Sequence, residues 1–303
     1  MKILLTGSSG FIGKQLKSQG GEFRCVMRGG IKQDDNDIYR INNFDGLTCW
    51  AGAFADIDVI VHLSGLAHSK SFTKQDYQSV NVDGTLNLAQ EAAKGGVRRF
   101  VFISSIGVNG TSTSTMPFSH FDKPNPQNAY AQSKFDAEIG LKRIAAEIGM
   151  ELVIVRPTLV YGPNAPGNFG MLTKLVKKLP LLPFGLANNR RDFIAVQNLT
   201  DLLMTCAKHK DAAGHTFLAS DGDTVSTRDF TNAIAKGLDK KVTQLPIPVS
   251  LMRSAGWFTG KSKIMEQLFG NLEVDSSNIK QVLGWKPPLT MEQAMASLRH
   301  SSK

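Results

Sequence analysis

The fold of this 303-residue chain is decided at its start, in the stretch Lys2-Ile-Leu-Leu-Thr-Gly7-Ser-Ser-Gly10-Phe-Ile-Gly13. An apolar strand without polar alternation is buried on both faces, which is typical of the centre of a parallel sheet. Gly7 suits a tight turn into a helix, Gly10 lets backbone approach a pyrophosphate, and Gly13 lets the helix pack close to the sheet. Free N–H groups and the helix dipole favour a phosphate there. The stretch therefore predicts a dinucleotide site.

The glycine spacing is Gly-x-x-Gly-x-x-Gly, one residue longer at the front than the common dinucleotide fingerprint. The glycines alone are weak evidence for a dinucleotide site, because any tight turn from strand to helix may use them. The position of the motif carries the prediction, since a buried strand precedes it and a helical pattern follows.

The composition is that of an ordinary globular protein, with 42% hydrophobic and 20% charged residues. No apolar run approaches about 18 residues and no basic-then-apolar leader opens the chain, so we expect a cytoplasmic protein without stable membrane insertion. Cys25, Cys49 and Cys206 are scattered, which predicts reduced thiols and no metal site.

The net charge of +9 is compatible with a nucleic acid, an anionic membrane surface or an anionic small substrate. The basic residues are spread along the chain, and no recognisable nucleic-acid module accompanies them. We therefore expect a small phosphorylated ligand and no nucleic acid.

Strand and helix patterns alternate through the first half of the chain, which predicts a doubly wound parallel sheet of the Rossmann type. After the opening unit we expect strands at 23–27, 38–41, 58–63, 99–104 and 151–156, the last stopped by Pro157. Helices are expected at about 47–54, 75–94 and 128–148, and a loop at 29–37.

The pattern changes after about residue 160, where Gly and Pro cluster at 161–167. A strand is expected at 216–219, and capping-box patterns at Ser226 and Thr290 predict two helix starts. We predict a dinucleotide-binding domain at 1–160. Residues 161–303 would form a smaller, mainly substrate-binding region, with some segments returning to the first domain.

Arg28 stands at the end of the second strand, where an acidic residue would hold the ribose hydroxyls of NAD. An arginine cannot accept those hydrogen bonds, but it pairs with a 2′-phosphate. NADP(H) is therefore favoured over NAD(H), although an exposed arginine without a ligand explains the position equally well.

Tyr130-Ala-Gln-Ser-Lys134 places a phenol and an ammonium on one helix face, and the strand before it ends in Ser104-Ser105. A nearby cation favours the phenolate, so we expect Lys134 to lower the pKa of Tyr130 from about 10 toward neutrality. Ser105 supplies a hydroxyl that could share the substrate oxygen with Tyr130. A solvent-facing Tyr/Lys pair is the alternative.

Together these motifs resemble the extended short-chain dehydrogenase/reductases, in particular the NAD-dependent epimerase/dehydratase family that acts on nucleotide sugars. The matching segments are Thr6-Gly-Ser-Ser-Gly-Phe-Ile-Gly13, His62-Leu-Ser-Gly-Leu-Ala67, Asn81-Val-Asp-Gly-Thr-Leu86, Phe102-Ile-Ser-Ser105, Tyr130-x-x-x-Lys134, Arg156-Pro-Thr-Leu-Val-Tyr-Gly-Pro163, Arg190-Arg-Asp-Phe193 and Leu283-Gly-Trp-Lys-Pro287. They extend over nearly the whole chain.

The resemblance implies a role for each matching residue. Tyr130 would be the acid/base, Lys134 would tune it and hold the nicotinamide ribose, and Ser105 would bind the reacting oxygen. Cofactor contacts are implied for Gly7, Ser9, Gly10, Phe11, Ile12, Gly13, Arg28, Leu63, Ser64, Gly65, Asn81, Ser104, Tyr130, Lys134, Pro157 and Thr158, and substrate contacts for Ser105, Asn168 and Arg191.

The chain departs from the dehydratases of the family, which carry an acidic pair directly after the catalytic hydroxyl residue. Ile106 and Gly107 occupy those positions and cannot do acid/base work, so dehydration is rejected. His62 and His68 flank the cofactor loop, and we interpret both as packing residues rather than catalytic ones.

These observations lead us to expect an NAD(P)-dependent oxidoreductase acting at C4 of a nucleotide sugar of the UDP-N-acetylhexosamine type. The favoured reaction is 4-keto reduction for surface-polysaccharide synthesis, and the alternative is a 4-epimerase with tightly bound NAD. A non-catalytic dinucleotide sensor is a third interpretation. The apolar stretch 249–258, followed by Lys261 and Lys263, leaves open a lipid-linked substrate or an ordinary buried helix. A homodimer is adopted by analogy alone.

Overall fold

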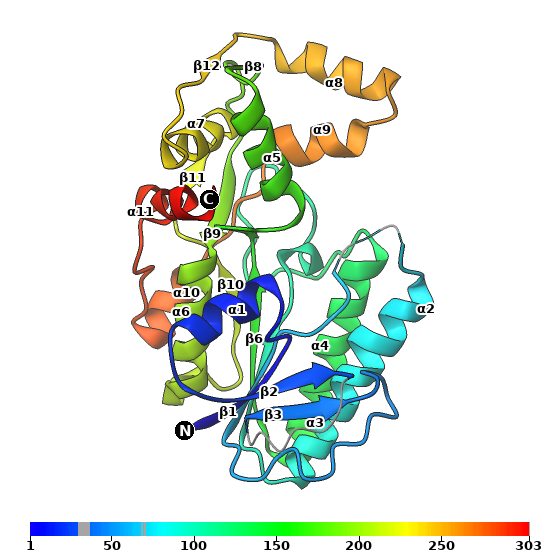
Figure 1. Cartoon of the computed structure of the whole chain (residues 1–303). Coiled ribbons are helices and arrows are strands. Elements are labelled where there is room, and N and C mark those ends of the chain that lie inside the picture. The colour runs from blue at the N-terminus through cyan, green and yellow to red at the C-terminus, as the bar shows by residue number, and fades with distance from the viewer. Residues whose placement is uncertain (30–36, 68, 70, 303) are drawn as a thin grey trace.

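The structure is a computed structural model that describes residues 1–29, 37–67, 69 and 71–302. His68 and most of the predicted 29–37 loop lie outside the described residues. Seven parallel strands form the central sheet in the order β10-β6-β5-β4-β1-β2-β3, and they confirm the doubly wound Rossmann-type fold (Figure 1). The strands are β1 Lys2–Thr6, β2 Glu22–Arg28, β3 Ile38–Ile41, β4 Val59–His62, β5 Arg99–Ile103, β6 Glu151–Pro157 and β10 Thr216–Ala219.

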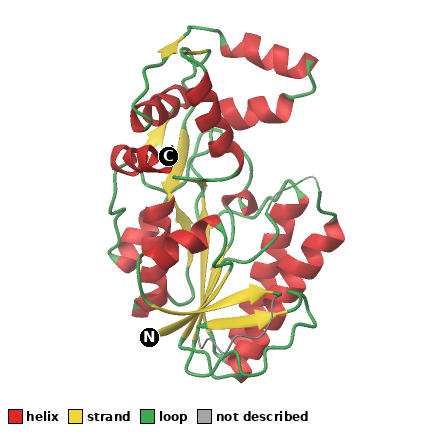
Figure 2. Ribbon diagram, in the orientation of Figure 1, coloured by secondary structure: helices red, strands yellow, loops and turns green. Residues whose placement is uncertain are grey.

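Both faces of this sheet are covered by helices, as Figure 2 shows. On one face α1 (Phe11–Ser18), α6 (Val196–Lys208) and α10 (Ser277–Leu283) pack against the odd side chains of β1. On the other face α3 (Gly84–Lys94) and α4 (Ala129–Ile148) pack against Leu4. The continuous apolar runs of the central strands follow from this two-sided burial.

The strand β10 joins the edge of the sheet beside β6, although it lies far along the chain. Its Ala219 pairs with Pro157, which is the last residue of β6. We expected Pro157 to stop this strand one residue earlier, but a proline fits at a strand end where its missing N–H is not needed. The domain boundary near residue 160 remains a prediction.

The predicted helix at 47–54 was wrong, because the structure has only turns there. The Asp45 carboxylate accepts from the N–H of Leu47 at 2.9 Å, and the Thr48 hydroxyl accepts from the N–H of Asp45 at 2.9 Å. These short side chains satisfy the backbone groups that a helix would use. Trp50 is nevertheless buried. The apolar pattern of 47–54 therefore indicated burial correctly, although the segment is not a helix.

The predicted helix at 75–94 forms as three consecutive segments. They are α2 (Lys74–Tyr77), the π-helical turn η1 (Gln78–Asp83) and α3. Asn81 lies in the π-helical turn and points at the loop after β4, where it bonds to Leu66. Single π turns of this kind are frequent at functional sites.

The C-terminal lobe stands over the carboxyl ends of the sheet strands (Figure 1). Phe169, Phe193 and Phe230 form its aromatic core. Its strands are β7 Leu159–Tyr161, β8 Leu181–Leu182, β9 Arg191–Ala195, β11 Thr224–Val225 and β12 Thr243–Gln244. Its helices are α5 Gly167–Lys178, α7 Thr227–Gly237, α8 Val249–Phe258, α9 Ser262–Phe269 and α11 Met291–Ala296. Short 3-10 turns are η2 Ile106–Val108, η3 Lys210–Ala212 and η4 Ser297–Ser302.

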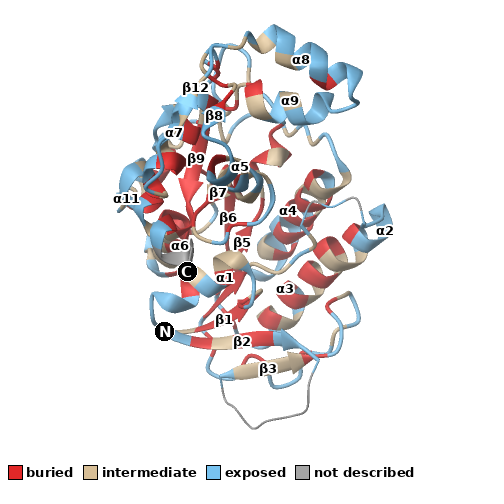
Figure 3. Cartoon of the chain, turned by 45° about the horizontal axis from the view of Figure 1, so that its top comes forward, coloured by how far each residue is buried: buried red, intermediate tan, exposed pale blue. Residues whose placement is uncertain are grey.

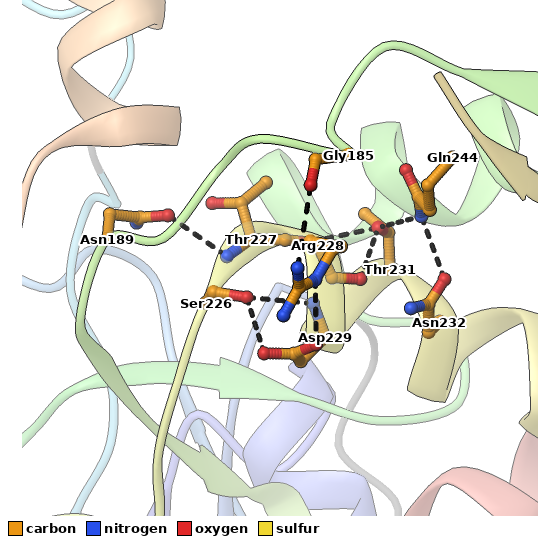
Figure 4. A network of polar contacts seen from close by, with 9 residues as sticks. All are labelled: Gly185, Asn189, Ser226, Thr227, Arg228, Asp229, Thr231, Asn232 and Gln244. Carbon is orange, nitrogen blue, oxygen red and sulfur yellow. Dashed lines mark hydrogen bonds and ion pairs between the residues drawn. The ribbon is translucent and has the colours of Figure 1, made fainter. Parts of the chain in front are cut away.

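Both predicted helix starts exist. Thr290 and Gln293 form a reciprocal capping box at α11. At α7 the Ser226 hydroxyl accepts from the N–H of Asp229 at 3.0 Å. The Asp229 carboxylate accepts from the Ser226 hydroxyl, whereas in a capping box it would accept from the Ser226 N–H (Figure 4). None of the described helices is long and apolar enough to cross a bilayer.

Candidate active site

The glycine turn between β1 and α1 leaves its outer backbone open to a ligand. Gly7 has φ +72°, and a Cβ there would lie 2.9 Å from the carbonyl carbon of Leu63. A Cβ on Gly13 would lie 2.2 Å from the oxygen of Gly7, so only a glycine at this position lets the turn pack against the helix. A Cβ on Gly10 would meet only Gly7 within 4 Å. In the described chain no side chain caps α1 at Gly10. This arrangement fits a pyrophosphate.

The other residues of this turn face solvent, the sheet and the C-terminal lobe. Ser9 is exposed at its tip, while Ile12 is partly buried and packs against the core of the sheet. Phe11 packs against the core of the C-terminal lobe. The glycine turn therefore joins the two parts of the molecule.

The loop after β4 is tied to β1 by the Thr6 hydroxyl. That oxygen accepts from the N–H groups of Leu63 at 3.2 Å and Ser64 at 3.1 Å. It also lies 2.7 Å from Nδ1 of His62, whose Nε2 lies 2.9 Å from the hydroxyl of Thr85. Burial, followed by the charge of Lys134, holds the pKa of His62 well below its usual range. The ring is therefore neutral and hydrogen-bonded at both nitrogens, as a packing residue is.

Gly65 brings this loop against the predicted catalytic helix. A Cβ on Gly65 would lie 3.0 Å from Oδ1 of Asn81 and 3.3 Å from Nζ of Lys134. Asn81 accepts from the N–H of Leu66 at 2.7 Å and donates to the hydroxyl of Ser133 at 3.0 Å. Asn81 thus clamps the loop onto α4, and Lys134 lies within reach of the loop backbone.

The phenol of Tyr130 and the hydroxyl of Ser105 are joined by a hydrogen bond. Ser105 begins the turn η2 directly after β5, and its oxygen also accepts from the N–H of Gly107 at 3.1 Å. The ring of Tyr130 lies edge-on to Tyr77, with centroids 6.2 Å apart. The structure therefore brings together the two hydroxyls that we singled out.

The expected lowering of the Tyr130 pKa by Lys134 is wrong. Burial raises the pKa of Tyr130 to about 12, Tyr77 adds to the rise, and the bond with Ser105 opposes it. The Lys134 ammonium donates instead to the carbonyl of Ile103 at 3.1 Å and lies 4.7 Å from the ring centroid of Phe102. At neutral pH the phenol is therefore protonated.

A buried ion pair holds α4 on the sheet, and our sequence reasoning missed it. Glu138 of α4 accepts two bonds from Arg156 of β6, at 2.9 and 2.5 Å, and one from the hydroxyl of Ser104 at 2.5 Å. Arg156 also donates to Asn109 at 2.8 Å. The predicted cofactor residue Ser104 thus directs its hydroxyl into this network, one residue before Ser105.

Glu138 also acts on Lys134, which lies one helical turn before it. Burial lowers the pKa of Lys134 to about 8, and the Glu138 carboxylate opposes this shift. An acid four residues after a functional lysine, on a helix face that is otherwise apolar, was the available signal in the sequence.

Beyond Ser105 lies a cavity of about 460 Å³ between the sheet and the C-terminal lobe. It is lined by Pro157, Thr158, Asn168 and Arg191, which we had singled out. Arg191 is the only charged residue among the described residues that line it. Thr158 donates its hydroxyl to the carbonyl of Ala219, so its position depends on β10. Three residues of α9 that we did not predict also line the cavity: Ile264, Gln267 and Leu268.

Arg191 presents a partly buried guanidinium to this cavity. It donates to the carbonyl of Gly270 at 2.9 Å, and burial lowers its pKa to about 10, with Glu266 opposing the shift. It therefore stays charged at neutral pH. Asn168 donates to Oε1 of Gln267 at 3.2 Å across the cavity rim. A guanidinium and an amide that line the same cavity as Ser105 suit a phosphate-bearing ligand.

The α9 wall is held in place by Asn189 and by the start of α7, which Figure 4 shows bonded to each other. The N–H of Thr227 donates to Oδ1 of Asn189 at 3.0 Å, and the Thr227 hydroxyl donates to the carbonyl of Leu268. Asn189 donates to the same carbonyl at 3.2 Å and to that of Gly270. The end of α9 is therefore fixed to the lobe.

Arg28 is exposed at the end of β2, where it pairs with Ile41 of β3. We expect Arg28→Ala to weaken NADP(H) binding by about 10- to 100-fold and to leave NAD(H) binding within about twofold, because only a 2′-phosphate needs the guanidinium. Titration with all four dinucleotides measures this. Arg98→Ala, an exposed arginine that directly precedes the interior strand β5, is the control. Equal losses for both cofactors would contradict this role.

The chain resembles proteins of known type. The model of the NAD dependent epimerase/dehydratase family matches residues 3–219. UDP-glucose 4-epimerase of Vibrio cholerae is 40% identical over 96% of this chain and 92% of its own length. N-acetyl-alpha-D-glucosaminyl-diphospho-ditrans,octacis-undecaprenol 4-epimerase of Escherichia coli O157:H7 is 24% identical over 97% and 92%. The structure of UDP-glucose 4-epimerase from Thermotoga maritima with UDP-glucose superposes with a TM-score of 0.76 at 20% identity, covering 99% and 98%.

Proposed function

Since the chain belongs to the NAD dependent epimerase/dehydratase family, we propose that it is a nucleotide-sugar 4-epimerase that acts on a UDP-hexose or UDP-N-acetylhexosamine. The observation that carries this proposal is the hydrogen-bonded pair Tyr130 and Ser105 beside a cavity with one guanidinium, Arg191. The relative from Vibrio cholerae, a UDP-glucose 4-epimerase by name, supports the same reaction. We therefore prefer 4-epimerisation to the 4-keto reduction that the sequence favoured.

The residues present fit a nicotinamide dinucleotide. The glycine turn would hold its pyrophosphate, residues 63–65 would line it, and Lys134, beside Gly65, would hold the nicotinamide ribose. When bound in the oxidised form, the cofactor supplies a hydride acceptor and a positive charge. Ile106 and Gly107, which follow Ser105, offer no acid or base for elimination, so the proposal excludes dehydration.

The chain's own groups handle the proton and the substrate. Tyr130 would first lose its own proton to solvent, which the charge of Lys134 would favour. The Tyr130 phenolate would then accept the C4 hydroxyl proton as the C4 hydride leaves, and Ser105 would hold the same oxygen. Tyr130 would return the proton when the hydride comes back to the opposite face of the ketone. The first step leaves the phenol protonated, and burial, which raises the pKa of Tyr130 to about 12, favours that form until the proton is returned. Arg191 would pair with the diphosphate and leave the sugar free to turn.

A 4-keto reductase is the second candidate, and Arg28 favours it. An exposed arginine at the end of β2 suits the 2′-phosphate of NADPH, which a reductase would bind and release in each cycle. The same catalytic pair would donate the proton to the ketone.

The test begins with the protein purified without added cofactor, denatured, and analysed for released nucleotide. Stoichiometric NAD, together with interconversion of UDP-glucose and UDP-galactose or of their N-acetyl counterparts, is the expected result. An empty site that prefers NADPH and reduces a UDP-4-keto sugar would replace the epimerase by the reductase. Turnover of neither substrate class would overturn both and leave a dinucleotide sensor.

A further inference from the structure

The hairpin surface, formed by α8 and α9 at the end of the C-terminal lobe, exposes large apolar side chains. Leu251 is 61% exposed, Trp257 69% and Phe258 80%. Figure 3 shows α8 almost entirely in the colour of exposed residues. Gly256 is its one buried residue, so the interpretation of 249–258 as an ordinary buried helix is wrong.

The exposed residues on α8 follow the helical period. Leu251, Ala255 and Phe258 are spaced i, i+4 and i+7 and therefore share one face, and the exposed Trp257 lies at the flank of that face. The opposite face carries Gly256, where a Cβ would lie 2.2 Å from the Met265 side chain of α9. α8 packs on α9 through that inner face. The outer stripe points away from α9.

Basic side chains accompany the stripe. Lys261 and Lys263 are exposed in and after the turn between the helices, and Arg253 lies on α8. Glu266 is the only acid in residues 249–269, and it pairs with Arg253 at 3.6 Å. The two lysines therefore leave the hairpin with a net positive charge. Aromatic and leucine side chains beside lysines are the composition of helices that lie in a membrane interface.

We propose that the hairpin surface binds the face of an anionic lipid bilayer, with Leu251, Trp257 and Phe258 in the headgroup region. Lys261 and Lys263 would contact the anionic headgroups, which is the charge complementarity that selects this partner. A second copy of the chain fits poorly, because a two-fold contact would set the same positive hairpins against each other.

Such binding would place the cavity mouth at the bilayer. Ile264, Gln267 and Leu268 of α9 line the cavity that Ser105 opens into, and the end of α9 is fixed to the lobe. The hairpin is thus connected rigidly to the site. The inference does not depend on which reaction the site performs.

The test uses the full chain and vesicles of phosphatidylcholine with or without about a third of phosphatidylglycerol. Trp257 is a built-in probe, because Trp50 and Trp285 are buried. We expect a blue shift of tryptophan emission and co-sedimentation with the anionic vesicles, both reduced by salt. Trp257→Ser with Phe258→Ser should lower sedimentation at least about tenfold. Phe121→Ser, at an 86% exposed phenylalanine outside the hairpin, should leave it unchanged.

A charge pair of variants separates headgroup attraction from apolar insertion. Lys261→Glu with Lys263→Glu should lower binding to anionic vesicles at least about tenfold. Lys280→Glu with Lys286→Glu, exposed lysines near α10, should leave binding within about threefold. No emission shift and no sedimentation at low salt would overturn the proposal. The proposal would also be overturned if both pairs of lysine substitutions lowered vesicle binding equally. A chain that forms dimers through the hairpin but does not bind vesicles would overturn it as well.

Discussion

Tyr130→Phe is expected to lower kcat by about 10²- to 10⁴-fold and to leave the dinucleotide Kd unchanged. The substitution removes the one phenol that bonds to Ser105, while the ring keeps its contact with Tyr77. The described residues that line the cavity beyond Ser105 offer no replacement acid or base, because Arg191 is the only charged one among them. Steady-state kinetics and a dinucleotide titration on the same preparation measure both effects.

The matched control is Tyr77→Phe. This neighbouring phenol donates toward the carbonyl of Ala67 at 3.2 Å and does not contact Ser105. Its loss should change kcat by less than about tenfold, since Tyr77 acts on Tyr130 indirectly, through the ring contact and by adding to the rise of its pKa. A Tyr130→Phe enzyme with a tenth or more of normal activity would refute the assignment of Tyr130 as the acid/base.

Glu138→Ala is expected to lower the free energy of unfolding by about 3–5 kcal/mol, because it leaves a buried guanidinium without its counter-charge. The Arg156 side chain is 3% exposed and that of Glu138 is 1% exposed. Denaturant unfolding followed by circular dichroism measures the loss. The control on the same helix is Glu147→Ala. Its pair with Arg143 is exposed at 3.9 Å and should contribute about 0.5 kcal/mol or less.

A double variant distinguishes a lost charge from lost packing. Glu138→Ala combined with Arg156→Met should be more stable than Glu138→Ala alone, since no unpaired charge stays buried. If the double variant is instead less stable than the single one, the ion pair does not explain the loss. A mild destabilisation in Glu138→Ala, similar to that in Glu147→Ala, would contradict the prediction directly.

The parts of this molecule that could be predicted from sequence are those with local causes. The glycine turn follows from residues within one strand-turn-helix unit, and the placement of Tyr130 and Lys134 one turn apart on the same helix follows from the helical period. That Ser105 lies near Tyr130 was predicted, as a hydroxyl that could share the substrate oxygen, because a strand end precedes the helix that carries Tyr130. Each of these needs only the period of an element and the order of elements along the chain.

The parts that could not be predicted depend on contacts between distant segments or on competing side chains. Gln267 reaches Asn168 across 99 residues of sequence, so no local pattern could place α9 in the cavity wall. The turns at 47–54 exist because Asp45 and Thr48 satisfy backbone groups, which an apolar pattern does not register. The pKa of Tyr130 required knowing that its phenol is buried and that Lys134 donates to the carbonyl of Ile103.

The late arrival of β10 has a consequence for biosynthesis. Its strand partner β6 ends at Pro157, but β10 begins only at Thr216. A ribosome adds about 5–20 residues per second, so for several seconds the nascent chain holds β6 as an unpaired and largely apolar edge. Pairing with other nascent chains competes with folding during that interval. Synthesis, more than the finished fold, is thus the stage at which this protein is exposed to self-association.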